Sequence, residues 1–381
     1  MKNKPNLMLL IILIMFPQFV ETIYSPALPN IAQAFQVSNQ QASLTLSFYF
    51  IAFALGVIFW GILSDIIGRR SAMILGLFTY AIGAFMALLT KDFNIILIAR
   101  VVAAFGASVG SIITQTILRD VYRKEELGYV FSIIGIALSL SPIIGFMAGG
   151  FITKGFGYHG VFMVVLLVAV LLSISIILLL PETKPQLKQD RPKVGVVLLE
   201  LLRDRIIWLS ALLVALFNIM LFSYYSLAPF IFKHSGYSPT HFGYSGIVLA
   251  IGSLAGGMLN KRLVCLNFSA QRLIYLSSFI SVIGAFGVFM VQDSLWFLLP
   301  IMFVLIAFSI AIPNILSQAL IKYRDVAGTA GAIFGLLYYT LIGLGLTVSG
   351  WIQDFGLVLI ISSILAILFA GAYKKSTSRT H

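Results

Sequence analysis

The chain has 381 residues, of which 60% are hydrophobic and only 10% are charged, and its formal net charge is +12 at pH 7. Soluble globular domains are about 25% charged, so this composition excludes a protein whose whole surface faces water. The mean hydropathy of +1.03 indicates that lipid is the main solvent. The single cysteine, Cys265, excludes an internal disulfide, and we assign it no role.

Long apolar segments recur along the chain, separated by short stretches that hold most of the charge. A helix needs about 20 apolar residues to cross a hydrocarbon core about 30 Å thick. The sequence therefore predicts an all-α membrane protein with twelve transmembrane helices in two six-helix bundles. The predicted spans are 7–28, 42–63, 71–90, 94–117, 126–151, 159–180, 205–232, 241–263, 270–290, 294–320, 326–349 and 353–373.

The first predicted span could be mistaken for a signal peptide. It has no small-x-small cleavage site and continues through Glu21 to Pro26, so we expect a retained helix. The longest polar interval, Pro181 to Asp204, divides the spans six and six. We therefore expect an N-terminal bundle over 1–181, a cytoplasmic linker over 182–204 and a C-terminal bundle over 205–381.

The basic residues predict the orientation. Of the 25 Lys and Arg, all except Lys91, Lys154, Lys233 and Arg100 fall in the N-terminal segment, the even-numbered loops or the C-terminal tail. By the positive-inside rule, both termini are expected in the cytoplasm and the protein in the bacterial inner (plasma) membrane. Because these residues lie in loops on one side, the net charge does not indicate nucleic-acid binding.

Two ionisable residues stand out inside predicted spans, Glu21 in the first and Arg100 in the fourth. A charge in hydrocarbon costs at least about 2.5–3.5 kcal/mol, so each is a candidate for function. Both lie about 21–22 Å from the cytoplasmic end of their span at 1.5 Å per residue. Two interpretations are open: Glu21 binds a proton in competition with a cationic substrate, or the two residues form a static network that holds their helices together.

Other polar and aromatic residues inside the spans are candidates for a substrate cavity. Gln18, Tyr24 and Ser25 share a helical face with Glu21. Aromatic walls with a few hydrogen-bonding groups suit bulky, partly apolar, often cationic ligands. For each tyrosine, packing or an interfacial position is the alternative. The candidates are Gln18, Tyr24, Ser25, Tyr49, Gln115, Asn218, Tyr224, Tyr225, Gln318, Tyr338 and Tyr339.

The fifth predicted span, 126–151, carries Pro142, Gly145, Gly149 and Gly150. The Gly145–Gly149 spacing is the small-xxx-small pattern that lets helices approach closely. Proline removes a backbone hydrogen bond and bends a helix. A gate seal and plain packing are both compatible with this pattern.

The segment Gly61-Ile-Leu-Ser-Asp-Ile-Ile-Gly-Arg-Arg70 resembles the G-x-L-S-D-x-x-G-R-R signature of the major facilitator superfamily. We expect Gly61 and Gly68 to allow close packing and a tight turn. Asp65 is expected to accept from a neighbouring helix end, and Arg69 and Arg70 to anchor the cytoplasmic face. The superfamily usually has a basic residue where Ile66 stands, so one branch of its charge network is missing here.

Further segments resemble the Bcr/CflA drug-efflux subgroup of that superfamily. They are Glu21-Thr-Ile-Tyr-Ser-Pro-Ala-Leu-Pro-Asn30, Leu118-Arg-Asp-Val-Tyr122, Pro142 with Gly149-Gly150, and Pro181-Glu-Thr-Lys-Pro185. The resemblance implies export of hydrophobic, often cationic compounds in exchange for protons. It places Glu21 beside or at the acidic position of the first helix, and Arg100 with Gly106 in the arginine motif of the fourth. Thr22, Ala103 and Phe146 depart from the subgroup's acid, glutamine and second proline.

The sequence thus predicts a secondary active transporter, with proton-coupled multidrug export as the first hypothesis and a dedicated metabolite or siderophore carrier, importers included, as the alternative. An enzyme is not expected, because the four histidines lie near helix ends or in the tail and there is no HExxH or GxSxG motif. We expect a monomer that binds a small-molecule substrate, protons and membrane lipid. No cofactor, metal or nucleic acid is expected, and the proton gradient would supply the energy.

Overall fold

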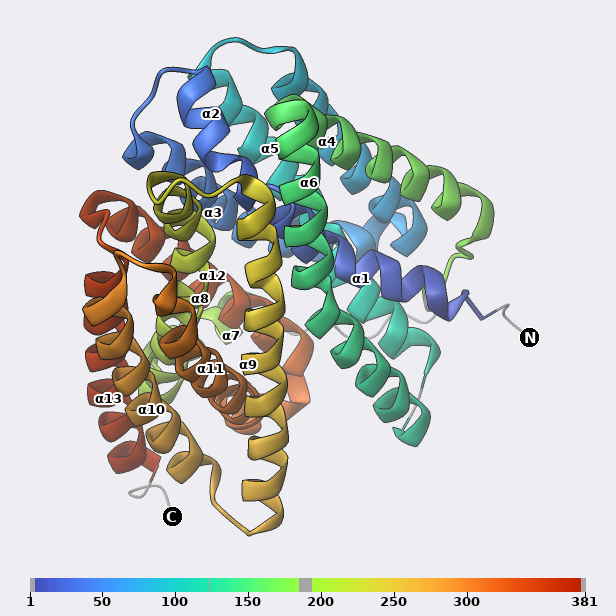
Figure 1. Ribbon diagram of the computed structural model, residues 1–381. Helices are drawn as coiled ribbons and strands as arrows, with labels where there is room; N and C mark the ends of the chain where they lie inside the picture. Colours follow the sequence, from blue (N-terminus) through green and yellow to red (C-terminus); the bar gives the residue numbers. More distant parts are fainter. Residues whose placement is uncertain (1–3, 123, 185–193, 378–381) are drawn as a thin grey trace. The chain divides into compact units, whose positions relative to one another are not determined.

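The computed structural model describes residues 4–122, 124–184 and 194–377 (Figure 1). Within these residues, eleven helices are long and apolar enough to cross a membrane. One of them, Glu126–Leu179, has 54 residues and would be about 80 Å long if straight. Its backbone leaves helical angles at Gly157 (φ 63°, ψ −161°), so it contains two spans. The all-helical, multi-pass membrane fold is confirmed.

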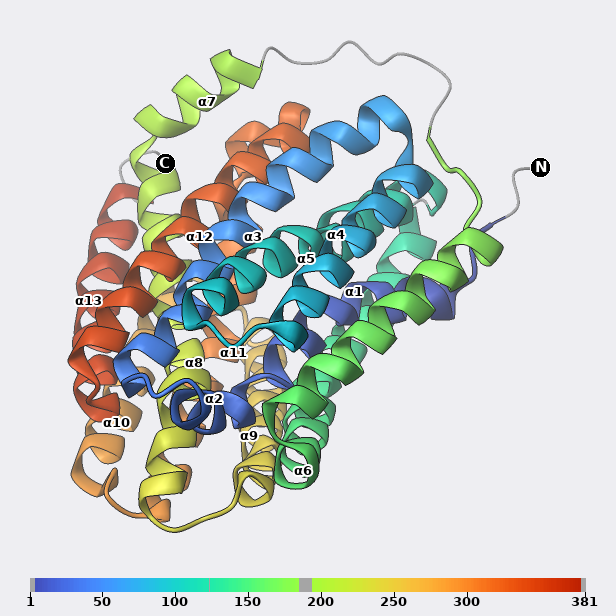
Figure 2. The same cartoon turned by 90° about the horizontal axis from the view of Figure 1, so that it is seen from above.

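Residues 1–190 form the first compact unit. Its helices are α1 (Leu7–Thr22), α2 (Leu28–Ala34), α3 (Asn39–Ile67), α4 (Arg69–Leu89), α5 (Phe93–Val121) and α6 (Lys124–Leu179). Helix α5 packs against α4, α3 and α1, and α6 packs against α1 and α4 (Figures 1 and 2). Every predicted span of this half overlaps one of these helices.

Glycines allow the close packing around α5. A Cβ on Gly83 of α4 would lie 2.6 Å from the Ala99 carbonyl oxygen, and one on Gly110 of α5 would lie 2.6 Å from the Leu13 carbonyl oxygen of α1. Real Cβ atoms do not approach backbone so closely, so the contacts need glycine at both positions. Helix α5 is thereby held against α1 and α4, and this fixes the position of Arg100.

The first predicted span is interrupted. Helix α1 ends at Thr22, a 3₁₀ turn covers Ser25–Ala27, and α2 continues to Ala34. Proline has no backbone N–H, so Pro26 and Pro29 cannot donate to the preceding turn. The predicted span over 7–28 lies within the single apolar segment Leu7–Ala34, but its helix is interrupted after Thr22, one residue beyond Glu21.

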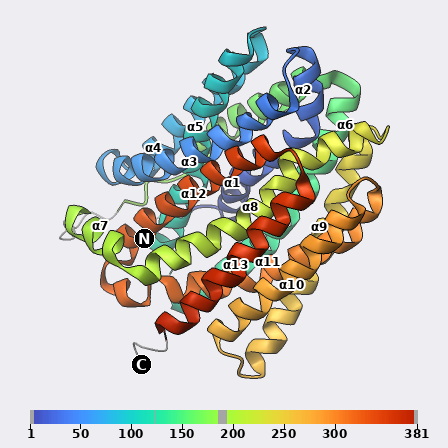
Figure 3. The same ribbon diagram turned by 90° about the vertical axis from the view of Figure 1, so that its left-hand side faces the viewer.

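Residues 191–381 form the second compact unit. Its helices are α7 (Val194–Arg203), α8 (Arg205–His234), α9 (Pro239–Cys265), α10 (Ala270–Val291), α11 (Leu298–Ala319), α12 (Ala327–Ile352) and α13 (Phe355–Thr377). Helix α8 packs against α11, α12 and α13, and α10 packs against α11 and α13 (Figure 3). The six predicted spans of this half overlap α8 to α13.

The predicted linker over 182–204 contains helix α7. This helix contacts α12 and α8, and its Val197 and Leu201 are buried, so it belongs to the second unit. Residues 185–193 of the predicted linker, Pro185 of the Pro181–Pro185 motif included, lie outside the described residues. The structure thus adds a helix over Val194–Arg203 to this interval, and the linker itself stays a prediction.

Candidate functional site

Arg100 lies between two tyrosine rings inside the first unit. Its guanidinium carbon is 3.9 Å from the centroid of the Tyr24 ring and 4.5 Å from that of the Tyr49 ring. The three side chains come from α5, the α1–α2 connection and α3, and Arg100 is only 3% exposed. Arginine presents a planar, weakly hydrated cation that stacks well on aromatic faces. The stacking holds the positive charge in place without a carboxylate.

Glu21 occupies the last turn of α1 and is 5% exposed. Within the described part of the chain, no ion pair of 4.0 Å or less joins it to Arg100. Its Oε1 is buried without a hydrogen-bond partner, as are Nε and Nη2 of Arg100. The static network that joins these two residues directly is therefore not present in this structure. A buried charge without hydrogen bonds is costly, so the Glu21 carboxylate can still accept a proton or a hydrogen bond, and the Arg100 guanidinium can still donate to water or to a ligand atom.

The break in α1 is covered by the glycines of α6. A Cβ at Gly145 would overlap Thr22 Oγ1, and a Cβ at Gly149 would overlap the carbonyl oxygen of Ile23. Thr22 also donates its hydroxyl to the Gln18 carbonyl oxygen at 2.8 Å. The small-xxx-small pair of α6 thus packs on the two residues that directly follow Glu21, so the motif of the fifth predicted span belongs to the candidate site.

The other predicted cavity residues of this unit differ in burial. Ser25 is fully buried, whereas Gln18 and Gln115 are half-buried. Gln115 donates from Nε2 to Ser111 Oγ at 3.5 Å, along the face of α5 that also carries Arg100. The first unit therefore brings Glu21, Arg100, Tyr24 and Tyr49 into one region. Gln115 lies outside this region, about four helical turns along α5 from Arg100.

In the second unit, Tyr224 lies in an aromatic cluster. Its ring centroid is 5.7 Å from that of Phe242, 6.0 Å from Phe355 and 6.2 Å from Phe297, and its hydroxyl donates to Ser245 Oγ. All four rings are essentially unexposed, so packing is the role that the geometry favours for Tyr224. The assignment of Tyr224 to a substrate cavity stays a prediction.

The remaining candidates of the second unit lie on three helices. Tyr338 and Tyr339 of α12 are half-buried, with ring centroids 4.5 Å apart. Asn218 of α8 donates to the Val214 carbonyl oxygen of its own helix at 2.8 Å. Tyr225 is 2% exposed, and Gln318 is half-buried.

The turn between α3 and α4 carries a charge network. Arg69, whose side chain is 7% exposed, donates from Nη1 to Asp65 at 2.5 Å and from Nε to Asp120 at 3.0 Å. Asp120 lies near the end of α5, so the network joins three helices. Gly68 adopts φ +98°, which non-glycine residues rarely adopt, and this turn brings Asp65 and Arg69 together.

Glu182 caps α4 from the end of α6. Its carboxylate accepts from the backbone N–H groups of Arg69 at 2.9 Å and Arg70 at 3.1 Å, and also from Thr183 and Lys184. Partial burial alone would raise the pKa of Glu182, but these N–H donors hold it below its usual value. Lys184 donates from Nζ to the Ile66 carbonyl oxygen at 2.9 Å, at the position where the superfamily usually has a basic residue.

One expectation for the motif glycines needs correction. A Cβ at Gly61 would meet only Ile112 Cγ1, at an ordinary 3.6 Å, so close packing does not require glycine there. Pro142 lies inside α6, and the bend expected there stays a prediction. Gly150 is buried on α6.

The sequence pattern of the Major Facilitator Superfamily matches residues 10–347. The chain belongs to this superfamily. Its fold is also that of the xylose transporter XylE from E. coli in a partially occluded inward open conformation, with a TM-score of 0.77, 14% identity and coverage of 97% of this chain and 96% of XylE. The expected fold and the expectation of a transporter are thereby confirmed.

Among its relatives, an uncharacterized transporter of Rickettsia bellii is 33% identical over 89% of this chain and 87% of its own length. A bicyclomycin resistance protein homolog of Haemophilus influenzae is 25% identical over 85% and 83%. Citrate exporter 1 of Aspergillus niger is 30% identical, but only over 44% of this chain and 32% of its own length. Within the described residues, no group of three His, Cys, Asp or Glu side chains could hold a metal ion.

Proposed function

We propose that this transporter exports small hydrophobic or cationic compounds in exchange for protons, and that Glu21 is the carboxylate that binds the proton. The observation that carries the proposal is a buried Glu21 whose Oε1 has no hydrogen-bond partner, one residue before the end of α1. Ionisable residues inside a membrane are costly and usually mark a pathway for ions or substrate. The bicyclomycin resistance protein homolog supports a drug as the exported compound.

In the proposed cycle, Glu21 holds a proton while no substrate is bound. A cationic or polar group of the substrate then binds the carboxylate, and the proton leaves. Arg100 contributes a fixed positive charge, because the rings of Tyr24 and Tyr49 both contact its guanidinium. A cation near Glu21 favours the ionised carboxylate, so Arg100 would promote release of the proton. We place the protein in the bacterial inner membrane with both termini in the cytoplasm, as the basic loops predict.

A second candidate function is export or import of a small carboxylate metabolite. It is favoured by Arg100, whose Nε and Nη2 are buried without hydrogen-bond partners and could bind a carboxylate. The partial similarity to a citrate exporter also supports this candidate. In that case Arg100 would bind the substrate, and Glu21 would not compete with it.

Transport in proteoliposomes separates the two candidates. Purified wild type, Glu21→Gln and Arg100→Gln would be tested with ethidium, chloramphenicol, bicyclomycin and citrate under an imposed pH gradient. We expect wild type to accumulate at least one of the first three compounds and Glu21→Gln to lose uphill accumulation. Asp92→Asn is the matched control, since Asp92 is exposed and asparagine also caps a helix N-terminus.

Citrate uptake that depends on Arg100 and not on Glu21 would instead establish the second candidate. If Glu21→Gln still drives uphill accumulation of a drug, Glu21 is not the coupling carboxylate. If wild type moves none of the four compounds under any gradient, both candidate substrate classes are wrong.

A further inference from the structure

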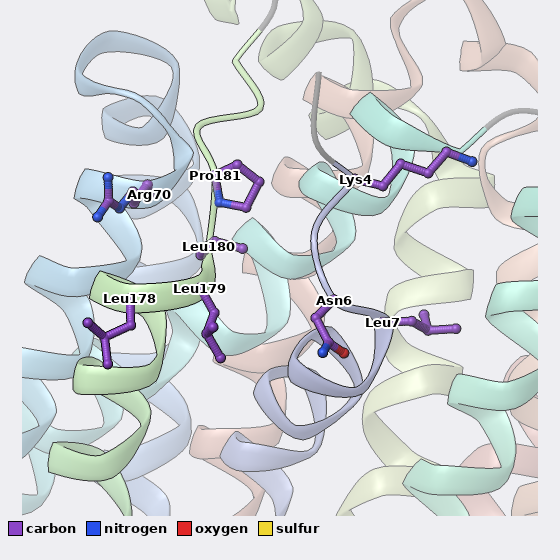
Figure 4. Close-up of a pocket in the computed structure, with 8 residues that line it drawn as sticks. All are labelled: Lys4, Asn6, Leu7, Arg70, Leu178, Leu179, Leu180 and Pro181. Carbon is purple, nitrogen blue, oxygen red and sulfur yellow. The ribbon is translucent and has the colours of Figure 1, made fainter. Parts of the chain in front are cut away.

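A cavity of about 750 Å³ lies in the first unit, between the start of α1 and the end of α6 (Figure 4). It is separate from Glu21 and Arg100, because it is lined by residues at the helix ends. The lining residues are Lys4, Asn6, Leu7, Arg70, Leu178, Leu179, Leu180 and Pro181. Helices α1 and α4 begin at this cavity, and α6 ends at it. Two spans precede the start of α4 and six precede the end of α6, so all three helix ends lie on the same side of the membrane. The cavity therefore lies at one face of the membrane.

The polar part of the lining is basic. Lys4 and Arg70 are its two charged residues, and they come from opposite sides of the cavity (Figure 4). Arg70 Nε is buried without a hydrogen-bond partner, while its Nη2 donates to the Ile177 carbonyl oxygen at 2.5 Å. Lys4 pairs with Glu126 at 2.6 Å, but its side chain is 57% exposed and remains available to a second anion.

The start of α1 adds to this positive environment. Asn6 caps the helix by accepting from Met8 N–H at 2.8 Å, and the first turn of α1 has no acidic residue. The N-terminus of a helix carries a partial positive charge and favours anions. Asn6 itself lines the cavity, so this end of α1 and the two basic side chains act on the same space.

The apolar part of the lining is exposed leucine. Leu178 is 74% exposed and Leu179 is 58% exposed, although both belong to the last turn of a membrane-spanning helix. Side chains in that place contact lipid chains rather than water. The cavity therefore combines basic groups with an apolar wall at the boundary between headgroups and acyl chains.

We propose that this cavity binds an anionic phospholipid, with the phosphate near Arg70, Lys4 and the start of α1 and an acyl chain along Leu178 and Leu179. Basic pockets beside membrane-spanning helices bind such headgroups by charge complementarity. The apolar wall favours a lipid over free phosphate, which shares only the headgroup chemistry. The proposal depends on the membrane fold and is independent of the transported compound and of proton coupling.

Native mass spectrometry of the intact protein tests this site. Wild type would be titrated with phosphatidylglycerol, with phosphatidylcholine of the same chains, and with inorganic phosphate as competitor. Lys4→Gln removes one basic group. Asn6→Asp keeps a capping side chain but adds a negative charge to the cavity. Arg262→Gln is the control, because it removes an exposed basic residue of the second unit.

We expect phosphatidylglycerol to bind more tightly than phosphatidylcholine, and each cavity variant to weaken it about fivefold, which corresponds to about 1 kcal/mol for one charge at an anionic surface. Arg262→Gln should bind as wild type does, and the melting temperature of each variant in detergent should show that it is folded. Equal binding by both variants and wild type, or equal binding of the two lipids, would overturn the proposal. Displacement of the lipid by inorganic phosphate would identify a phosphate site and also overturn it.

Discussion

Replacing Gly149 by alanine should disrupt the contact between α6 and the break in α1. A Cβ at this position would lie 2.9 Å from the Ile23 carbonyl carbon and 3.0 Å from its Cα, and would overlap its carbonyl oxygen. These are backbone atoms, so the neighbour cannot turn away as a flexible side chain could. The two segments would have to separate at the residues that directly follow Glu21.

The free-energy cost of overpacking at Gly149 can be compared with the gain in helix propensity from alanine. Overpacking a well-packed contact costs about 1–3 kcal/mol, whereas glycine to alanine inside a helix gains about 0.5–1 kcal/mol. The two ranges leave a net destabilisation of up to about 2.5 kcal/mol, and we expect about 1 kcal/mol for Gly149→Ala. Gly155→Ala on the same helix is the matched control, because a Cβ there would meet nothing within 4 Å, and it should be neutral or stabilising.

Thermal unfolding in detergent, followed by tryptophan fluorescence, measures the difference between these two variants. Uphill transport by Gly149→Ala should fall further than its stability explains, since the displaced break moves Glu21. Equal melting temperatures and equal transport for the two variants would refute the account of this contact.

Three further predictions concern the charge network and the stacked arginine. Asp120→Asn should lower the melting temperature and reduce the free energy of unfolding by about 1–3 kcal/mol, because it leaves the buried Arg69 with one carboxylate fewer. Glu126→Gln, which removes a carboxylate from an exposed ion pair, is the comparison and should reduce the free energy of unfolding by less than about 1 kcal/mol. The pKa of Glu182 lies below its ordinary 4.5 in the folded state. Its contribution to the stability of the folded protein is therefore complete above about pH 4.5 and is lost as the pH falls through the folded pKa. Glu182→Gln should lack this part of the acid sensitivity, which melting curves between neutral and acid pH would reveal. Arg100→Lys keeps the charge but loses the planar stacking on Tyr24 and Tyr49, so transport should fall well below wild type while the protein stays folded, and wild-type rates would contradict the role given to stacking.

Most of the fold could be predicted from hydropathy, because each span has to be apolar over its whole length. The break after Thr22 and helix α7 were not predicted. The prolines at 26 and 29 are compatible with the end of a span or with an interruption inside one, and α7 is amphipathic and lies in a charge-rich interval. Their positions depend on packing against other helices, which no local pattern records.

The sequence predicted which residues belong to the candidate site but not which of them contact one another. Glu21 and Arg100 stood out because charges are rare inside spans, but their sequence could not show that Tyr24 and Tyr49 stack on the guanidinium. The same holds for the α3–α4 turn, where the motif predicted Asp65 and Arg69 but gave no role to Glu182, a residue more than a hundred positions away. Contacts between segments far apart in the sequence can be identified only from the three-dimensional structure.

The most direct test of the central claim is proton release when substrate binds. Purified protein in weakly buffered detergent solution would receive a compound that wild type transports, and a pH indicator would report released protons. We expect release from wild type and from Asp92→Asn, and none from Glu21→Gln although it still binds the compound. Undiminished release from Glu21→Gln would contradict the assignment of Glu21 as the proton-binding carboxylate.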